Sequence, residues 1–298
     1  MTCRMGIDLG GTKTEVLVID AERQPLYRER FPTPADDYAA ILAAIGDEFS
    51  RARARFGADL TPGIGIPGAL SPRSGLLRNS NTQCLNGRPF GRDLEKLLNR
   101  EVRIENDANC FALSEALGGV ARGYRVVFGV IIGTGTGGGL VVDGKLLNGP
   151  HSISGEWGHN PLPWRREDDA VVTCYCGKQG CIETFLSGPG LARSYQARFG
   201  EARDSAAIVA AAARGEQSCI DTMERYYDQL ARSLAHLINI IDPDAIVFGG
   251  GMSNVDSIYP EVATRLGDYV FSDFVETPLL KAEHGDSSGV FGAALLWE

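Results

Sequence analysis

One histidine and three cysteines fall within 23 residues of this chain: His159, Cys174, Cys176 and Cys181. Imidazole and thiolate are the ligands that a tetrahedral zinc ion prefers. A single residue separates Cys174 from Cys176, and two glycines before Cys181 allow the backbone to turn around a metal. The alternative is a group of reduced core cysteines without a metal. Three cysteines in eight residues rarely arise from composition alone, so the sequence predicts a closed, structural zinc site.

Two acidic residues, Glu156 and Glu183, lie on either side of this cysteine-rich segment. We expect the zinc site to hold both carboxylates toward a polar ligand. The motif Glu-x-x-His at 156–159, followed by Cys-x-Cys-Gly-x-x-Gly-Cys-x-Glu at 174–183, resembles the signature of the ROK family. That family contains sugar kinases and sugar-responsive repressors, and the resemblance covers nearly the whole chain.

The composition is that of a soluble globular protein, with 44% hydrophobic and 22% charged residues among 298. A net charge of -9 argues against nucleic acid or an anionic membrane as a partner. No apolar run reaches the roughly 20 residues that span a bilayer, and no signal peptide is evident at the N-terminus. The remaining cysteines are scattered through apolar segments, which favours reduced thiols and a cytoplasmic location. They are Cys3, Cys84, Cys110 and Cys219.

A short apolar strand near the N-terminus contains Asp8 and ends in the pair Gly10 and Gly11, which Thr12 and Lys13 follow. Two further strands come directly afterwards, and such a meander is typical of the opening of an actin-like ATPase domain. The glycines let the backbone approach a phosphate, and the hydroxyl and the ammonium group suit phosphate oxygens. The aspartate is placed to hold Mg²⁺ through its waters. The alternative is an ordinary hairpin with an exposed lysine.

The same pattern recurs after an apolar strand at 126–132, where a stretch rich in Gly and Thr leads into two more strands. We therefore predict an internal duplication with one phosphate-binding hairpin in each half. A dinucleotide-binding interpretation of the glycine spacing is weak, because a strand rather than a helix follows. The phosphate-binding candidates of the second hairpin are Gly133, Thr134, Gly135, Thr136, Gly137, Gly138 and Gly139.

Asn106 and Asp107 lie where a strand meets a helix, and an aspartate at such a place can be a mere helix cap. The segment Asn-Asp-Ala-Asn at 106–109 resembles the catalytic motif of the ROK family, which implies that Asp107 is the general base. The resemblance also implies that the turn at Gly68 lines the sugar pocket. The polar loop around Asn81 suits hydrogen bonds to sugar hydroxyls, although a plain surface loop explains it equally well.

Further site residues come from the resemblance. His159 is expected to use one ring nitrogen for zinc and the other for sugar. A strand at 245–248 leads into Gly250 and Gly251, where the family places adenosine, and a glycine-rich turn without a ligand is the alternative. The residues that match the family's sugar contacts are Asn106, Asp107, Glu156, His159 and Glu183.

The predicted fold is α/β, with two lobes of the actin-like ATPase (ribonuclease H-like) type, duplicated βββαβα halves and a cleft between the lobes. The N-terminal lobe is expected over 1–118 and the C-terminal lobe over 119–298. A last helix at about 286–298 is expected to pack back on the N-terminal lobe, as the resemblance implies. An actin-like filament protein would need neither the zinc motif nor the Asn-Asp motif.

The predicted reaction transfers the γ-phosphoryl group of ATP to a hexose hydroxyl, with Mg²⁺ and a structural Zn²⁺. The loops at 79–87, 156–164 and 174–176 most resemble the bacterial fructokinase (manno(fructo)kinase) branch. That branch implies conversion of D-fructose and ATP to D-fructose 6-phosphate and ADP, with mannose or glucose as further substrates. N-acetylglucosamine kinase and glucokinase are the alternatives within the family. A sugar-sensing repressor is disfavoured, because only about five residues precede the first strand. A homodimer is expected from the family alone.

Overall fold

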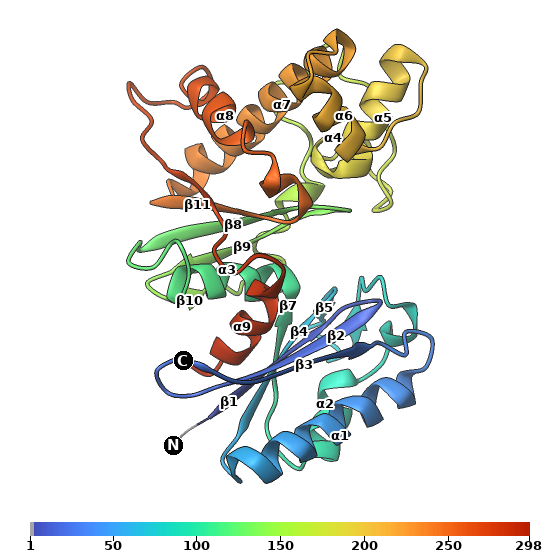
Figure 1. Ribbon diagram of the computed structural model, residues 1–298, viewed down its shortest axis with the longest axis vertical. Coiled ribbons are helices and arrows are strands. Elements are labelled where there is room, and N and C mark those ends of the chain that lie inside the picture. Colours follow the sequence, from blue (N-terminus) through green and yellow to red (C-terminus); the bar gives the residue numbers. More distant parts are fainter. Residues whose placement is uncertain (1–2) are drawn as a thin grey trace. The chain divides into compact units, whose positions relative to one another are not determined.

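The computed structural model describes residues 3–298, which form two compact units (Figure 1). The first unit contains the chain up to Gly123, together with Gly139–Ser154 and Glu283–Glu298. The second unit contains Tyr124–Gly138 and Gly155–Ala282. Each unit is therefore assembled from segments that lie far apart in the sequence.

The sheet of the first unit has the strand order β3-β2-β1-β4-β7. Strands β1 to β3 form an antiparallel meander, whereas β1, β4 and β7 run parallel. Almost every residue of β2 and β4 is buried, as expected for a sheet that is covered on both faces. The strands are β1 (Arg4–Leu9), β2 (Lys13–Ile19), β3 (Pro25–Pro32), β4 (Thr61–Ile66) and β7 (Arg103–Asn106).

Helices α1 (Tyr38–Phe56) and α2 (Phe90–Leu98) lie side by side on one face of this sheet (Figure 1). The buried residues of α1 recur at helical spacing and join side chains of β1, β2 and β4 in one apolar core. The carboxylate of Asp37 caps α1 by accepting hydrogen bonds from the main-chain nitrogens of Ala39 and Ala40 at 2.9 and 3.1 Å.

Helices α3 (Asp107–Leu117) and α9 (Ser288–Leu295) cover the other face. Glycine is required where these elements meet. A β-carbon at Gly6 or Gly63 would overlap carbonyl oxygens of α9, and a β-carbon at Gly292 would overlap a carbonyl oxygen of α3. The C-terminal helix therefore packs unusually close to β1 and β4, near the strand that carries Asp8.

The sheet around the second glycine-rich hairpin has the order β10-β9-β8-β11-β12. Strands β8 to β10 are antiparallel, and β8, β11 and β12 are parallel, so the pattern of the first sheet is repeated. The predicted duplication and fold class are confirmed. The strands are β8 (Val126–Ile132), β9 (Thr136–Val142), β10 (Lys145–Leu146), β11 (Ala245–Gly249) and β12 (Leu279–Lys281).

The helices of the second unit gather around α7, which contacts each of the other four (Figure 1). Its middle turns are buried nearly all round, because helices and loops cover several of its faces. These helices are α4 (Glu183–Leu186), α5 (Gly188–Phe199), α6 (Ser205–Ala213), α7 (Gln217–Ile241) and α8 (Ile258–Leu266).

Shorter elements complete the part of the chain that the structure describes. They are the strand pair β5 (Ala69–Leu70) and β6 (Leu77–Arg78) and the 3-10 turns η1 (Gln83–Leu85), η2 (Trp157–His159), η3 (Gly251–Asn254) and η4 (Gly285–Ser287). Among residues 3–298, no helix combines the length and the apolar character that crossing a bilayer requires.

Candidate active site and metal centre

The turn between β1 and β2 carries the first group of phosphate-binding candidates. The main-chain nitrogen of Gly10 donates to the carbonyl oxygen of Lys13 at 3.0 Å, and a β-carbon at Gly10 would lie 2.7 Å from that oxygen. The hydroxyl of Thr33 donates to the carbonyl oxygen of Gly10 at 2.8 Å. Thr12 and Lys13 are exposed, so a hydroxyl and an ammonium group stand beside a rigid backbone turn.

Asp8 lies near the end of β1, next to this turn. Burial raises the pKa of Asp8 to about 7, and the carboxylates of Asp107 and Glu15 add to the increase. A β-carbon at Gly289 would lie 3.0 Å from the Asp8 carboxylate, so only glycine leaves this side of the carboxylate open. Oxygen donors of this kind fit Mg²⁺, which would relieve the repulsion between the acidic groups.

Asn106 and Asp107 lie at the junction of β7 and α3. Asn106 Oδ1 caps the helix by accepting from the main-chain nitrogen of Ala108 at 2.9 Å, and Asp107 Oδ1 lies 2.8 Å from the same nitrogen. Asn106 Nδ2 also donates to the carbonyl oxygen of Gly68 at 3.0 Å. The first unit therefore brings Gly68, Asn106 and Asp107 together, with Asp8 close enough to act on Asp107 electrostatically.

Asn81 lies beside the first glycine turn. A β-carbon at Gly11 would be 3.8 Å from Asn81 Oδ1 and 3.7 Å from the hydroxyl of Thr82. The amide of Asn86 braces this loop, because it accepts from the main-chain nitrogen of Ser80 and donates to its carbonyl oxygen, both at 2.9 Å. The loop that carries Asn81 is therefore held next to the phosphate-binding candidates of the first hairpin.

The second Gly/Thr stretch divides between a turn and a strand. Strand β9 begins at Thr136, so only Gly133, Thr134 and Gly135 form the turn. Gly250 and Gly251 approach this turn from the end of β11. A β-carbon at Gly250 would overlap the carbonyl oxygen of Ile132, and a β-carbon at Gly133 would be 3.9 Å from the nitrogen of Gly251. The residues of the stretch that lie in β9 are Thr136, Gly137, Gly138 and Gly139.

Glu183 is bound to this hairpin. One of its carboxylate oxygens accepts from the main-chain nitrogen of Thr136 at 2.9 Å, and a β-carbon at Gly135 would lie 2.8 Å from that oxygen. The indole nitrogen of Trp157 donates to the carbonyl oxygen of Gly137 at 2.8 Å, which fixes the neighbouring residue Glu156 on the same hairpin. The second hairpin therefore holds the carboxylate of Glu183 directly and the residue that follows Glu156 in the chain.

The four predicted zinc ligands come together, with their donor atoms within 4.8 Å of one another. His159 Nδ1 lies 3.7 Å from Cys174 Sγ, and Cys176 Sγ lies 3.6 Å from Cys181 Sγ. Thiolates about 2.3 Å from a tetrahedral zinc would be about 3.8 Å apart, so the donor set fits this ion. Four protein donors leave no open position, which is the arrangement of a structural site.

We predict that Cys176→Ser weakens zinc binding by more than about 100-fold. Removing a residue that only hydrogen-bonds to a metal ligand costs roughly 10–100-fold in affinity, and loss of a ligand should cost more. The melting temperature should fall as well, because metal binding energy contributes to folding. Metal analysis and thermal unfolding of the purified variant would measure both effects. Cys84→Ser, the same change at a half-buried cysteine of the first unit, is the control. Wild-type protein that contains no zinc yet is stable would contradict this prediction.

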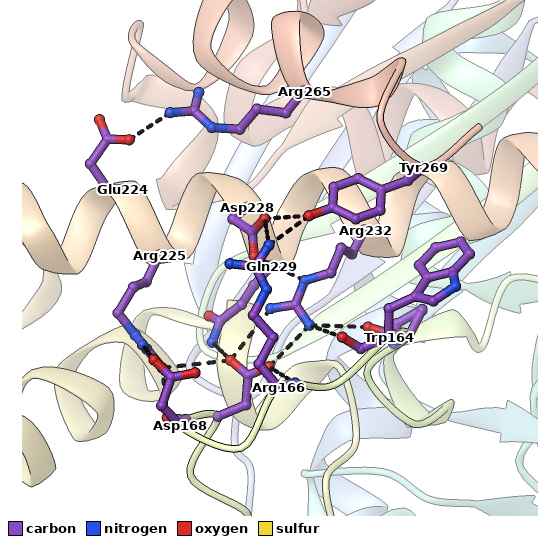
Figure 2. A network of polar contacts seen from close by, with 12 residues as sticks. Trp164, Arg166, Asp168, Glu224, Arg225, Asp228, Gln229, Arg232, Arg265 and Tyr269 are labelled. Atoms are coloured by element: carbon purple, nitrogen blue, oxygen red, sulfur yellow. Dashed lines mark hydrogen bonds and ion pairs between the residues drawn. The ribbon is translucent and has the colours of Figure 1, made fainter.

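A buried polar network fixes the segment between His159 and Cys174 to α7 (Figure 2). The guanidinium of Arg232, whose side chain is only 1% exposed, donates to the carbonyl oxygens of Pro163 and Trp164 at 3.1 and 2.9 Å. It also donates to the carboxylate of Asp169 at 3.0 Å. Two main-chain carbonyls and one carboxylate of this segment therefore depend on a single side chain of α7.

Asp169 is 3% exposed and accepts further hydrogen bonds from the main-chain nitrogen of Arg166 and the amide of Gln229, both at 2.8 Å. Burial raises the pKa of Asp169, but the hydrogen bonds from Arg232, Arg166 and Gln229 outweigh it, so this pKa lies below its ordinary value. Arg232 Nε also donates to Asp228 at 3.0 Å. The sequence patterns did not identify this network, because Arg232 and Asp169 lie 63 residues apart in the sequence.

Tyr175 was also missed as a site residue. Its hydroxyl lies 3.0 Å from His159 Nε2, on the side of the ring opposite the cysteines. The carboxylates of Glu183 and Glu156 are close enough to act on this hydroxyl electrostatically, so it lies near both candidate hexose carboxylates.

Two sheets of equal topology, each with a glycine-rich hairpin, define the actin-like ATPase fold. The chain belongs to the ROK family, whose model matches residues 4–298.

Among curated relatives, the N-acetyl-D-glucosamine kinase of Pectobacterium atrosepticum is 41% identical over 300 residues, which cover 98% of this chain and 97% of the relative. The crystal structure of a ROK hexokinase from Thermus thermophilus is 29% identical, with a TM-score of 0.87 and coverage of 98% of this chain and 97% of that one. A ROK family glucokinase from Streptomyces griseus, in complex with glucose and AMPPNP, is 26% identical, with a TM-score of 0.77 and coverage of 99% and 98%.

Proposed function

We propose that this protein is an ATP-dependent hexose kinase. One observation carries the proposal: Asp8, Gly68 and Asp107 lie at the carboxyl ends of the parallel strands β1, β4 and β7. Ligands of α/β proteins bind at this edge of a parallel sheet. The solved ROK glucokinase that holds glucose and AMPPNP supports an ATP-dependent reaction with a sugar for this family.

The proposed roles follow from charge and position. Asp107 accepts the proton of the attacking sugar hydroxyl late in the reaction, when the hydroxyl has become acidic. The backbone of Gly10 and Gly11 and the exposed groups of Thr12 and Lys13 hold phosphate oxygens. Mg²⁺, held near Asp8, would neutralise phosphate charge. The turn that contains Gly133, Thr134 and Gly135 is the second phosphate candidate, and Gly250 and Gly251 are candidates for contact with adenosine.

The hexose contacts that we propose combine carboxylates and amides, which suit a ligand made of hydroxyls. In the first unit, Asn106 is oriented by its bond to Gly68, and Asn81 belongs to the braced loop. In the second unit, Glu156 and Glu183 are held on the hairpin of β8 and β9, and His159 is held by the metal site.

N-acetyl-D-glucosamine is the hexose that the comparisons favour, because curated relatives with that activity are 41% identical over nearly the whole chain. Fructose remains the second candidate, on the resemblance of the loops at 79–87, 156–164 and 174–176. The relatives reported above do not support fructose. The two sugars differ strongly, because the first carries an acetamido group and the second has its carbonyl carbon at a different position.

A coupled assay of ADP formation, with ATP and a panel of fructose, mannose, glucose and N-acetyl-D-glucosamine, tests the proposal. The substrate is the sugar with the highest kcat/KM, and the position of the phosphate follows from analysis of the product. A protein that phosphorylates none of these sugars, although it is folded and contains zinc, would overturn the hexose-kinase assignment.

We predict a specific pH dependence from Asp8. Its pKa is raised to about 7, so the protonated form stabilises the fold, and this contribution is lost as pH rises toward and through 7. Without divalent cations, the melting temperature should fall across that range. Mg²⁺ should reduce the fall, because it binds the charged carboxylate. Asp8→Asn should flatten the profile and abolish the effect of Mg²⁺, whereas Asp47→Asn, at an exposed position of α1, should leave both unchanged. A wild-type profile that does not respond to Mg²⁺ would contradict a cation site at Asp8.

A further inference from the structure

A row of charged side chains lies on the face of the first sheet that α9 covers. In the antiparallel register of β1, β2 and β3, Asp8 pairs with Glu15 and Glu15 pairs with Arg30, so these side chains point to the same face. Lys13 and Arg28 lie on this face as well, because each is two residues from a member of the row along its own strand. The row therefore extends from the candidate carboxylate for Mg²⁺ to the edge strand β3.

Glu15 is buried, with 2% of its surface exposed, and it holds both arginines of this row. Its two carboxylate oxygens accept hydrogen bonds from Nε of Arg28 at 2.6 Å and from Nε of Arg30 at 2.8 Å. Both arginines also donate through Nη2 to the hydroxyl of Ser287, at the start of α9. Each guanidinium group is therefore fixed from two sides, and two cations on one carboxylate leave an excess of positive charge.

Arg30 is the arginine that lies nearer to the first glycine turn. Lys13, at the end of that turn, pairs with the second residue after Arg30, whereas Arg28 pairs with Leu17, further along β2. Arg30 and Lys13 are close enough to act on the carboxylate of Asp8 electrostatically. The contacts of Arg30 use Nε and Nη2, and its side chain is exposed, so N–H donors remain for a ligand.

We propose that Arg30 binds the terminal phosphates of ATP, beside the turn between β1 and β2. This inference rests on the proposed hexose-kinase activity. A guanidinium group presents its donors in a rigid fork that matches phosphate oxygens, and such charge-assisted hydrogen bonds are stronger than neutral ones. Phosphoryl transfer depends on neutralising charge on these phosphates. Arg30 adds a second fixed cation to the one that Lys13 supplies.

Arg30→Met tests the inference, because methionine keeps much of the apolar stem and removes the guanidinium group. KM for ATP should rise about tenfold or more, as expected for losing a hydrogen bond to a charged group, and KM for the hexose should hardly change. Arg28→Met is the matched control, since Arg28 has the same two partners and is 46% exposed against 44% for Arg30. It should leave both KM values unchanged. An unchanged KM for ATP in Arg30→Met, or an equal rise in both variants, would overturn the inference.

Equilibrium binding in the absence of sugar distinguishes a phosphate contact from a general loss of nucleotide affinity. With Mg²⁺ present, Arg30→Met should weaken the binding of AMPPNP about tenfold and leave the binding of AMP unchanged, because AMP lacks the two terminal phosphates. If AMP and AMPPNP lose affinity equally, the change acts on the shape of the nucleotide site, and the proposed contact is wrong.

A second pair of variants keeps the test decisive if Arg30→Met does not fold. Arg30→Lys and Arg28→Lys retain the positive charge beside Glu15 and lose only the planar fork. Weaker AMPPNP binding should then be confined to Arg30→Lys. Equal affinities of the two lysine variants for AMPPNP would overturn the inference.

Failure of this inference is distinguishable from failure of the proposed function. If the protein is not a hexose kinase, the wild type phosphorylates no sugar of the panel. If only the role of Arg30 is wrong, the wild type is active, and Arg30→Met and Arg28→Met have the same KM for ATP.

Discussion

Asp107→Asn is expected to lower kcat by a factor on the order of 10² to 10⁴, the usual range for removing a general base. The change keeps the size of the side chain and its hydrogen bonding to a sugar hydroxyl, and it removes only the capacity to take the proton. KM for the hexose should therefore rise modestly, and KM for ATP should hardly change. Steady-state kinetics of the purified variant would measure all three quantities.

The competing explanation is that Asp107 merely supports the start of α3. Asp93 provides the control, because it lies in the first turn of α2 and accepts a hydrogen bond from Tyr38 at 2.6 Å. Asp→Asn at either position removes a negative charge from a helix N-terminus, which stabilises by only about 0.3–1 kcal/mol. Both variants should therefore keep nearly normal melting temperatures, and only Asp107→Asn should lose kcat. A fully active Asp107→Asn enzyme would remove Asp107 from the mechanism.

Local patterns predicted the parts of the site that depend on short stretches of chain. Two apolar strands separated by a short glycine-rich stretch are a signal for a hairpin, so both hairpins could be placed from the sequence. The four predicted zinc ligands fall within one segment, and their spacing already limited how the backbone could turn. The caps were harder, because Asn106 and Asp107 are adjacent, and the hydrogen bond from Asn106 to the carbonyl oxygen of Gly68 joins residues 38 positions apart.

Local patterns could not show which glycines are required by tertiary packing. The second Gly/Thr stretch was predicted as a phosphate loop, but its later residues lie in β9. Glycine is needed at Gly138 because a β-carbon would lie 2.8 Å from both the carbonyl oxygen of Gly129 and the ring of Phe128. The glycines at Gly6 and Gly63 likewise serve close packing against α9, which lies more than 200 residues away in the sequence. Such requirements come from partners that a local window does not contain.

The Arg232–Asp169 network also could not be predicted from local patterns, because its two charges are 63 residues apart. It matters for the site because Arg232 holds the segment between His159 and Cys174, and this segment has only irregular structure and single-residue bridges. The buried ion pair and the carbonyl bonds of Arg232 therefore fix where the chain approaches the metal site from both sides.

We predict that Arg232→Met, which keeps most of the side-chain volume, destabilises the protein by about 3–5 kcal/mol, the usual result of removing one partner of a buried ion pair. Asp169 would then be a buried carboxylate without its strongest partner, and the carbonyl oxygens of Pro163 and Trp164 would lose their donor. Arg166→Met is the matched control. Its side chain is 55% exposed and bonds to the same Asp228, so it should cost no more than about 1 kcal/mol.

Urea unfolding of the zinc-loaded proteins would measure both free energies, and a double-mutant cycle would separate the terms. Adding Asp169→Leu to Arg232→Met removes the unpaired buried charge, so the double variant should regain part of the loss. Recovery should be incomplete, because the carbonyl oxygens of Pro163 and Trp164 still lack a donor. If Arg232→Met and Arg166→Met proved equally mild, the network would not be what fixes this segment to α7. The loop between His159 and Cys174 would then have to be held by its two ends at the predicted metal site.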